Sequence, residues 1–384
     1  MAELHIITSE YPPQAGGVSD YTHVVANGLA AAGDEVHVWS PLVESKAQNG
    51  APESAQVFVH RDLGRLSPWD LRHAGELLDR FSAPRRLLVQ WVPHSYGYRS
   101  MNLPFCLWLW NRARRKGDLV EVMAHECFLP FKRWAWKQNF AALVQRLMTM
   151  ILLRAARRVW ISIPAWETRW RPFALGRQVP FVWLPVPSNI EVVHDPMGVS
   201  AVRERYGVNG DPVLGHFGTY ARHDRRVLEA TLPQLFGNGE ETKLILMGRD
   251  SDSMRDQLIK RHPDLRGVIH ATGTLDARDL SLHLSACDVL LQPCRGGVST
   301  RRTSIMAGLS HGRPIVTTSG WQTDALWRES QAVALVPDGD VKAIAEETRR
   351  LLSDKKERER LSRYARVFYE ERFDWRHTIS ALRR

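Results

Sequence analysis

The sequence of 384 residues has few of the features that mark scaffolds built on disulfides, zinc or membrane spans. Its four cysteines form no CxxC pair and have no histidine pattern nearby, so reduced thiols in a cytoplasmic protein are expected and no metal site is predicted. No apolar run reaches the roughly 18 residues that a membrane-spanning helix needs. The first residues have the pattern of a strand and lack the basic leader and long apolar core of a signal peptide.

Acidic residues are outnumbered by basic ones, 42 against 52, and the formal net charge is +10. This excess indicates an anionic partner, which charge alone leaves open among a nucleotide, a phospholipid surface and a nucleic acid. No nucleic-acid-binding motif is present, so a nucleic acid is not the expected partner. The length predicts two domains of ordinary size, and a hydrophobic fraction of 44% is enough for two cores.

One stretch lacks acidic residues altogether, from position 289 to position 323. It begins with a short apolar run, 288–292, that predicts a buried parallel strand. A glycine turn and a helical pattern follow, the helix is expected to stop at Gly312, and 314–318 predicts the next strand. This is a complete βαβ unit.

The chemistry of this unit lies in its turn, where Gly297 allows a tight backbone and a helix begins nearby. Free backbone N–H groups at a helix N-terminus attract anions, and Arg301 and Arg302 add two permanent positive charges. A phosphate or diphosphate is the expected guest, although the arginines could also simply solvate an exposed first turn. The hydroxyl residues suited to capping this helix are Ser299, Thr300 and Thr303.

The segment resembles the donor-binding signature of GT-B nucleotide-sugar glycosyltransferases, specifically the glycogen-synthase-like and sucrose-synthase-like family four. The matching runs are Ala286-Cys287-Asp288-Val, Gln292-Pro293 and Gly312-Arg313-Pro314-Ile-Val. The Glu-x7-Glu pair of that family is missing, because Ser299 and Ala307 occupy its two positions. The arginine run resembles a bacterial branch with an Arg-Arg-Gly-Ser-like sequence there. We infer that arginine charge on the diphosphate has partly replaced carboxylate contacts to the sugar and ribose.

The resemblance covers nearly the whole chain and implies an α/β fold of two Rossmann-like doubly wound domains that face each other across a cleft. Residues 1–185 would form the acceptor-binding domain and 186–365 the domain that binds the nucleotide-sugar donor. Residues 366–384 would form a C-terminal helix that crosses back to the first domain. A proline-rich run near mid-chain, 180–188, marks the expected linker.

Two loops of the first domain carry further candidates. Gly16 and Gly17 resemble the family loop Pro-Pro-x-x-Gly-Gly-Val, which implies contact with the donor, although a lone glycine pair is just as often structural. His94 and Tyr96 follow a predicted strand that ends at residue 90, and ligands bind at this edge of open α/β sheets. They are therefore candidate acceptor-side residues.

The next strand, 119–124, delivers His125 and Glu126 to the same edge. His125 resembles the family's strand-terminal histidine, which contacts the transferred sugar, and Glu126 would supply the carboxylate missing from the other half. A His-Glu pair in a cleft orients a hydroxyl or shares a proton. We assign catalytic roles to these two residues and to Arg302, and leave open that His125 is structural.

In the second domain, Gly218 ends a predicted strand, and the arginines after it stand where the family carries an arginine and a lysine on the diphosphate. Arg222 and Arg225 are the expected phosphate contacts, with Arg226 in reserve; a solvated helix start is the alternative. Thr274 resembles the loop that holds the donor base.

Residues 131–170 combine tryptophans with arginines and lysines around a predicted amphipathic helix. The combination fits a peripheral contact with anionic lipid at the inner membrane face. A packed helix with buried tryptophans and extended arginines fits it equally well.

The resulting hypothesis is a glycosyltransferase that moves a sugar from a nucleotide-diphosphate-sugar to a glycan, lipid-linked or small-molecule acceptor. The resemblance implies retention of configuration, no cofactor, no metal ion and a UDP-sugar rather than a GDP-sugar. A non-catalytic relative that serves as a scaffold in a glycan pathway is the alternative, because the paired glutamates are missing.

Overall fold

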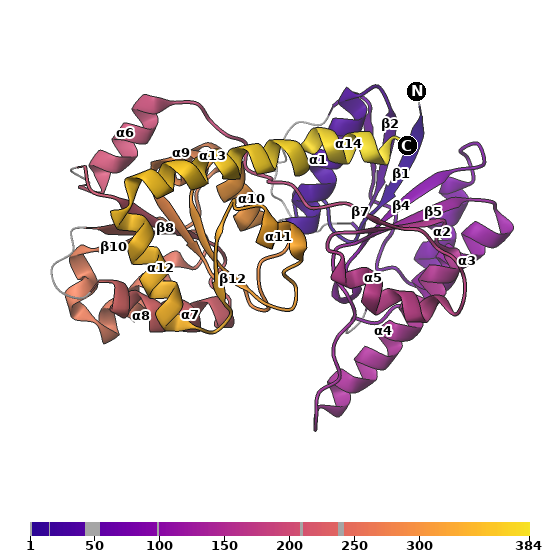
Figure 1. Ribbon diagram of the computed structural model, residues 1–384. Coiled ribbons are helices and arrows are strands. Elements are labelled where there is room, and N and C mark those ends of the chain that lie inside the picture. The colour runs from indigo at the N-terminus through magenta and orange to yellow at the C-terminus, as the bar shows by residue number, and fades with distance from the viewer. Residues whose placement is uncertain (1, 15, 43–53, 98–99, 208–209, 237–241) are drawn as a thin grey trace. The chain divides into compact units, whose positions relative to one another are not determined.

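The computed structural model describes residues 2–14, 16–42, 54–97, 100–207, 210–236 and 242–384. The chain forms two compact units, one of residues 1–185 together with 375–384 and one of residues 186–374 (Figure 1). Each unit is an α/β domain with its own parallel sheet and hydrophobic core. The expected pair of doubly wound α/β domains is confirmed.

The sheet of the first unit is entirely parallel and has the order β3-β2-β1-β4-β5-β6-β7. Its strands are short runs whose residues are mostly buried on both faces, which is typical of parallel sheets. They are β1 (Glu3–Ile7), β2 (Glu35–Trp39), β3 (Val57–His60), β4 (Arg86–Trp91), β5 (Leu119–Ala124), β6 (Arg158–Ile161) and β7 (Phe181–Trp183).

Helices connect these strands, and polar side chains cap the N-termini of two of them. Ser67 and Asp70 form a capping box at the start of α2, and the Asn102 side chain accepts the Phe105 N–H at the start of α3. The helices are α1 (Gly17–Ala31), α2 (Pro68–Leu78), α3 (Leu103–Arg115), α4 (Trp136–Ala155) and α5 (Ala165–Trp170).

The second unit has a parallel sheet of order β10-β9-β8-β11-β12-β13. Its strands are β8 (Val213–Phe217), β9 (Lys243–Met247), β10 (Ile269–Ala271), β11 (Val289–Gln292), β12 (Ile315–Ser319) and β13 (Ala334–Pro337). Its helices are α6 (Pro196–Arg205), α7 (Arg222–Leu235), α8 (Ser251–Arg261), α9 (Ala277–Ala286), α10 (Thr303–Ser310), α11 (Ala325–Glu329), α12 (Val341–Ser353) and α13 (Lys355–Arg372). The βαβ unit predicted from the acid-free stretch is β11-α10-β12.

The C-terminal segment, expected to be one helix from residue 366, is divided between the units. Helix α13 runs through position 366 and belongs to the second unit, whereas α14 (Trp375–Leu382) belongs to the first. In the first unit α14 packs on α1 (Figure 1), and its Ile379 lies so close to Gly28 that an added Cβ there would approach within 2.6 Å. Arg383 pairs with Asp34 at 2.8 Å beside this contact.

Candidate functional site

The predicted site residues divide between the two units, and those assigned to the donor gather mainly in the second. There the chain builds β8, β9 and β10 toward one side of the sheet and then returns to place β11 on the other side of β8. The carboxyl ends of β8 and β11 therefore lie side by side at a topological switch point, where open α/β sheets bind ligands. The loops after these strands carry most of the predicted donor residues.

The loop after β11 needs its glycines for close backbone packing. Gly297 has φ of +93°, and a Cβ there would lie 2.2 Å from the backbone nitrogen of Gly320 in the loop after β12. The two loops are hydrogen-bonded: the Val298 N–H donates to the Thr318 carbonyl at 2.7 Å, and the Gln322 N–H to the Gly296 carbonyl at 2.9 Å. The turn is thus held in one conformation, as an anion cradle requires.

The hydroxyl residues of this loop are placed differently from one another. Ser299 and Thr300 are buried, and the Ser299 hydroxyl donates to the side-chain carbonyl of Gln322 at 3.4 Å. The Thr300 carbonyl accepts the N–H of Val186 at 2.9 Å. Neither residue reaches the loop surface, so we remove both from the set of donor contacts. Thr303, the first residue of α10, is half-buried and remains in it.

Arg302 is the N-cap residue of α10, and its own side chain forms no capping hydrogen bond. Its Nη2 lies 3.4 Å from the Arg295 carbonyl, a long hydrogen bond. Arg301 precedes it at a half-buried position. Burial raises the pKa of the Cys294 thiol, while the charges of Arg302 and Arg301 lower it and that of Asp224 raises it. The loop after β11 therefore lies close to the first turn of α7, where Asp224 is located.

Several buried nitrogen atoms at this edge have no hydrogen-bond partner in the described part of the chain, among them Nε2 of His216, Nε2 of Gln292 and Nε of Arg302. His216 and Gln292 lie at the ends of β8 and β11, each 3% exposed. Burial lowers the pKa of His216, and its Nδ1 donates to the Leu291 carbonyl at 2.7 Å, so Nε2 holds a free lone pair. Unpaired buried polar atoms cost about 1 to 3 kcal/mol each, and their concentration here indicates a ligand site.

The loop after β8 places its predicted residues in three roles. The Gly218 carbonyl approaches Gly248 so closely that a Cβ on Gly248 would lie 2.1 Å from it. Arg222 is exposed at the start of α7. Arg225 is engaged within the protein, since its Nε donates to the Tyr220 carbonyl at 2.7 Å and its Nη1 to the Ser253 hydroxyl at 3.3 Å. Arg222 is therefore the better placed of the two arginines for a ligand.

Thr274 lies at the same edge but farther away. It follows β10, which is separated from β8 by β9, so it lies about 10 Å from the switch point at the usual strand spacing. Thr274 is exposed. The N–H of the preceding Gly273 donates to the Ser251 hydroxyl at 2.9 Å and is therefore not available to a ligand.

In the first unit, His125 follows β5 directly and is buried. Its Nε2 lies 2.7 Å from the side-chain oxygen of Gln90, and its ring packs edge-on against Tyr21 with centroids 4.8 Å apart. Burial lowers the pKa of His125 to about 3, so the ring is neutral at pH 7 and can exchange hydrogen bonds but carries no positive charge. Glu126 is half-buried beside it in the chain.

The two acceptor-side candidates are separated by the structure. His94 is exposed on the short helical turn Pro93–Ser95 after β4. Tyr96 is fully buried between Trp91 and Phe105, and its hydroxyl donates to the Gln90 carbonyl at 2.7 Å. Its assignment to an acceptor site was wrong, because both the ring and the hydroxyl are used by the core.

Beside the glycine pair of the first unit lies Glu10, a residue that the sequence analysis missed. The Glu10 carboxylate accepts the backbone N–H groups of Val18 and Ser19 at 3.0 and 3.1 Å, which are the first donors of α1. A Cβ on Gly16 would lie 2.4 Å from this carboxylate, whereas one on Gly17 would meet nothing within 4 Å. A side chain at position 16 would collide with Glu10, so Gly16 has a structural role. Only for Gly17 does the prediction of a substrate-facing residue remain.

A second missed residue, Asp338, fixes the donor-side loop. Its Oδ2 accepts the N–H of Gly296 at 2.7 Å. It follows β13, two strands from β11, so only the sheet order brings it to the loop. Its place just beyond a predicted strand was the available signal, but carboxylates after strands occur in several loops of this chain.

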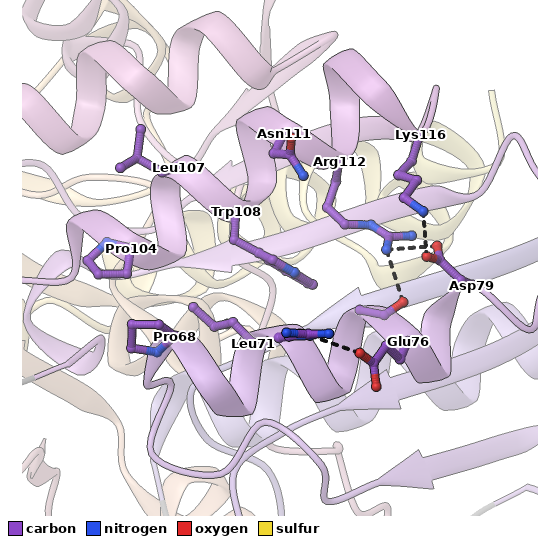
Figure 2. Close-up of a pocket in the computed structure, with 12 residues that line it drawn as sticks. Pro68, Leu71, Glu76, Asp79, Pro104, Leu107, Trp108, Asn111, Arg112 and Lys116 are labelled. Carbon is purple, nitrogen blue, oxygen red and sulfur yellow. Dashed lines mark hydrogen bonds and ion pairs between the residues drawn. The ribbon is translucent and has the colours of Figure 1, made fainter.

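A groove of about 450 Å³ lies elsewhere in the first unit, between α2 and α3 (Figure 2). Its floor contains Trp108 and Leu71, and its charged groups are paired with one another. Asp79 binds Arg112 at 2.9 Å and Lys116 at 2.8 Å, and Arg72 binds Glu76 at 3.0 Å. Because each of its cations is paired with a carboxylate, this groove offers no unpaired positive charge to a diphosphate.

In the tryptophan-rich segment 131–170, some tryptophans are buried in the core and others are exposed. Trp160, Trp166 and Trp170 are buried in the core of the first unit. Trp134 and Trp136, by contrast, are 88% and 73% exposed at the start of α4. Figure 1 shows this end of α4 extending away from the sheet of its unit.

The described residues contain neither a membrane-spanning helix nor a cluster of metal-binding side chains. None of the helices found there is long and apolar enough to cross a bilayer. Nor do three or more His, Cys, Asp or Glu side chains in those residues come together as a metal site would require.

Comparison with known proteins gives a family match in the second unit. The family "Glycosyl transferases group 1" matches residues 211–354, which include the switch point and both of its loops. A phosphatidyl-myo-inositol mannosyltransferase of Mycobacterium leprae is 24% identical over 315 residues, covering 76% of this chain and 80% of the relative.

Two solved structures have the same fold. Sucrose-phosphate synthase from Thermosynechococcus elongatus has a TM-score of 0.75 at 16% identity, covering 100% of this chain and 97% of that one. Anabaena HepE in complex with UDP-glucose has a TM-score of 0.70 at 15% identity, covering 98% of each chain. The chain therefore has the GT-B fold of these two structures, and its second unit matches the group 1 glycosyltransferase family over residues 211–354.

Proposed function

We propose that the chain transfers a hexosyl unit from a nucleotide-diphosphate-sugar, preferably a UDP-sugar, to a glycan, lipid-linked or small-molecule acceptor. The observation that carries this proposal is Arg302, a half-buried cation at the N-terminus of α10 whose Nε has no partner among the described residues. An anionic oxygen at this place would accept a hydrogen bond from Nε and meet the positive end of the helix dipole.

The charge that must be stabilised is that of the departing nucleotide diphosphate. Arg302, Arg301 and Arg222 supply fixed positive charge around the switch point, so catalysis rests on positioning and electrostatic stabilisation. These arginines provide what a divalent cation provides elsewhere, and we propose that transfer proceeds without a metal ion. A neutral His125 is suited to form a hydrogen bond with a sugar hydroxyl. We propose that His125 and Glu126 both contact the transferred sugar.

The preference for UDP rests on similarity, because HepE was solved with UDP-glucose. Thermal stability should be measured with UDP, GDP, ADP, dTDP and CDP in the presence of EDTA. A ligand at 100 times its dissociation constant adds about 2.7 kcal/mol to the native state, which is readily detected. Stabilisation by UDP alone is the expected outcome, and stabilisation by none of the five would contradict the proposal.

The variant Arg302→Ala tests the site itself. Losing a charge-assisted hydrogen bond costs about 1.5 to 3 kcal/mol, so UDP affinity should fall at least tenfold. Arg363→Ala is the matched control, because Arg363 is an exposed arginine of α13 in the same unit. Equal UDP affinity in the two variants would remove the arginine from the site. Retention of configuration is tested separately, by the anomeric signal of the first product in NMR.

We also propose a peripheral contact with anionic lipid through residues 131–170. The exposed Trp134 and Trp136 lie beside Arg133 and Lys137, which pack over their rings at 5.3 and 5.4 Å. No acidic residue occurs between Glu126 and Glu167. Interfacial tryptophans with neighbouring cations favour the surface of an anionic bilayer.

Vesicle flotation tests this contact. Trp134→Ala with Trp136→Ala should abolish binding to vesicles of phosphatidylcholine and phosphatidylglycerol. Trp69→Ala is the matched control, because Trp69 is 77% exposed in the same unit but lies on α2. Loss of flotation in both variants, or in neither, would argue against a contact at the start of α4.

A further inference from the structure

A second concave site lies in the first unit, at the edge of the sheet where the strands begin, whereas His125 lies at the edge where they end. It has a volume of about 650 Å³ and is located where α3 and α4 end and where β5 and β6 begin. We call it the arginine pocket, and its polar and aromatic lining is Trp110, Arg114, Asp118, Arg154, Arg157 and Arg177. Because β5 spans six residues at about 3.3 Å per residue, this pocket and His125 lie roughly 17 Å apart along the strand.

The single acidic side chain in this lining does not neutralise the arginines of the pocket. Asp118 is buried and pairs with Arg85 at 2.7 Å and with Arg112 at 2.6 Å. Both partners are themselves buried and belong to the core behind the pocket. The charge of Asp118 is therefore already balanced.

The four arginines have different local contacts. Arg177 donates from Nη1 to the carbonyl oxygens of Leu153 and Arg154, and so caps the end of α4. Arg114 packs over Trp110 at 5.4 Å. Arg154 and Arg157 are exposed, and neither side chain has an ion pair or hydrogen bond among the described residues. Two guanidinium groups are thus free to bind a ligand.

Favourable placement at helix ends explains only part of this cluster. Cations near a helix C-terminus interact well with its dipole, which accounts for Arg114 and Arg154. Arg157 lies beyond the end of α4, and nothing in that explanation requires the arginines to surround one concavity. In the smaller groove of Figure 2, which belongs to the same unit, Arg72, Arg112 and Lys116 are all paired with carboxylates.

From this contrast we propose that the arginine pocket binds a phosphate-bearing polyanion, separately from the nucleotide-sugar donor. Planar guanidinium groups match the geometry of phosphate oxygens and remain charged at every physiological pH. The volume accommodates more than one phosphate group, and Trp110 adds an apolar wall. The ligand is either a free phosphorylated molecule or the headgroup of an anionic lipid, which share this chemistry.

The test uses the full chain with Arg154→Gln and Arg157→Gln combined. Arg80→Gln is the matched control, because Arg80 is an exposed arginine in the same unit outside the pocket. Calorimetric titration with inorganic pyrophosphate, with saturating UDP present to occupy the donor site, should show affinity at least tenfold weaker in the double variant than in the control, at equal salt. Titration with UDP should be unchanged, since Arg302 lies in the other unit.

Vesicles distinguish the two sources of phosphate. Flotation with phosphatidylcholine containing phosphatidic acid, lost in the double variant but kept in Arg80→Gln, would identify a lipid headgroup. Weakened pyrophosphate binding with unchanged flotation would identify a free ligand. If both measurements are the same in the double variant and the control, the arginine pocket is not a phosphate site. Arg302→Ala separates this failure from failure of the donor site, because Arg302 does not line the arginine pocket and its loss affects only the donor site.

Discussion

Removing the Glu10 carboxylate should loosen the start of α1 by an amount that can be worked out from its contacts. The carboxylate accepts two backbone N–H groups, those of Val18 and Ser19, at 3.0 and 3.1 Å. Ser19 is fully buried, so water cannot easily replace the lost acceptor. Loss of a helix N-terminal acceptor costs about 0.5 to 2 kcal/mol, and a bond to a charged group about 1.5 to 3 kcal/mol. We expect a cost of about 2 kcal/mol for Glu10→Ala.

Hydrogen exchange of the α1 amides is the appropriate measurement, because a protein of two units need not unfold in a single transition. A local cost of about 2 kcal/mol raises the exchange rate about 30-fold. Glu10→Gln keeps an oxygen acceptor and loses only the charge near the helix dipole, so about 0.3 to 1 kcal/mol is expected. Exchange in Glu10→Ala within about twofold of the wild type, as for a neutral surface substitution, would refute the reasoning.

Further predictions follow from the same structure. Gly16→Ala should destabilise α1 because its Cβ would collide with Glu10, whereas Gly17→Ala, with open space, should stabilise it by up to about 1 kcal/mol; thermal melts of the two compare them. Burial lowers the pKa of His5 to about 3, so the unfolded chain binds more protons below pH 6.5 and stability should fall from about pH 6.5 toward pH 3. His5→Gln should flatten that dependence in denaturant titrations. His125→Gln should lower turnover more than UDP affinity, measured by initial rates and calorimetry.

The order of elements and the edge that carries the site could be predicted from the sequence. Short apolar runs such as 213–217 and 289–292 predict buried parallel strands, and glycine turns after them predict where loops approach one another closely. The predicted βαβ unit is β11-α10-β12 because its turn residues, its helical pattern and its second strand all agree.

Burial of individual side chains could not be predicted in the same way. Tyr96 lies in a loop next to a strand end, which made an exposed acceptor-side position plausible. Its neighbours in space, Trp91 and Phe105, come from β4 and α3 and enclose the ring. Only the packing of separate elements decides whether a loop residue faces a ligand or the core, and local pattern carries little information about it.

The two glycine turns show why similar motifs differ in what they can bind. Both follow a strand of a parallel sheet and both lead into a helix, and the sequence analysis assigned donor contacts to both. At α1 the first backbone donors are filled by Glu10, so an incoming anion would meet a carboxylate. At α10 the N-cap residue is Arg302, whose side chain forms no capping hydrogen bond and whose Nε has no partner among the described residues. The electrostatic difference therefore favours the second unit as the anion site. Glu10 fills the first backbone donors of α1, whereas the carboxylate at the other turn, Asp338, accepts the Gly296 N–H ahead of the helix.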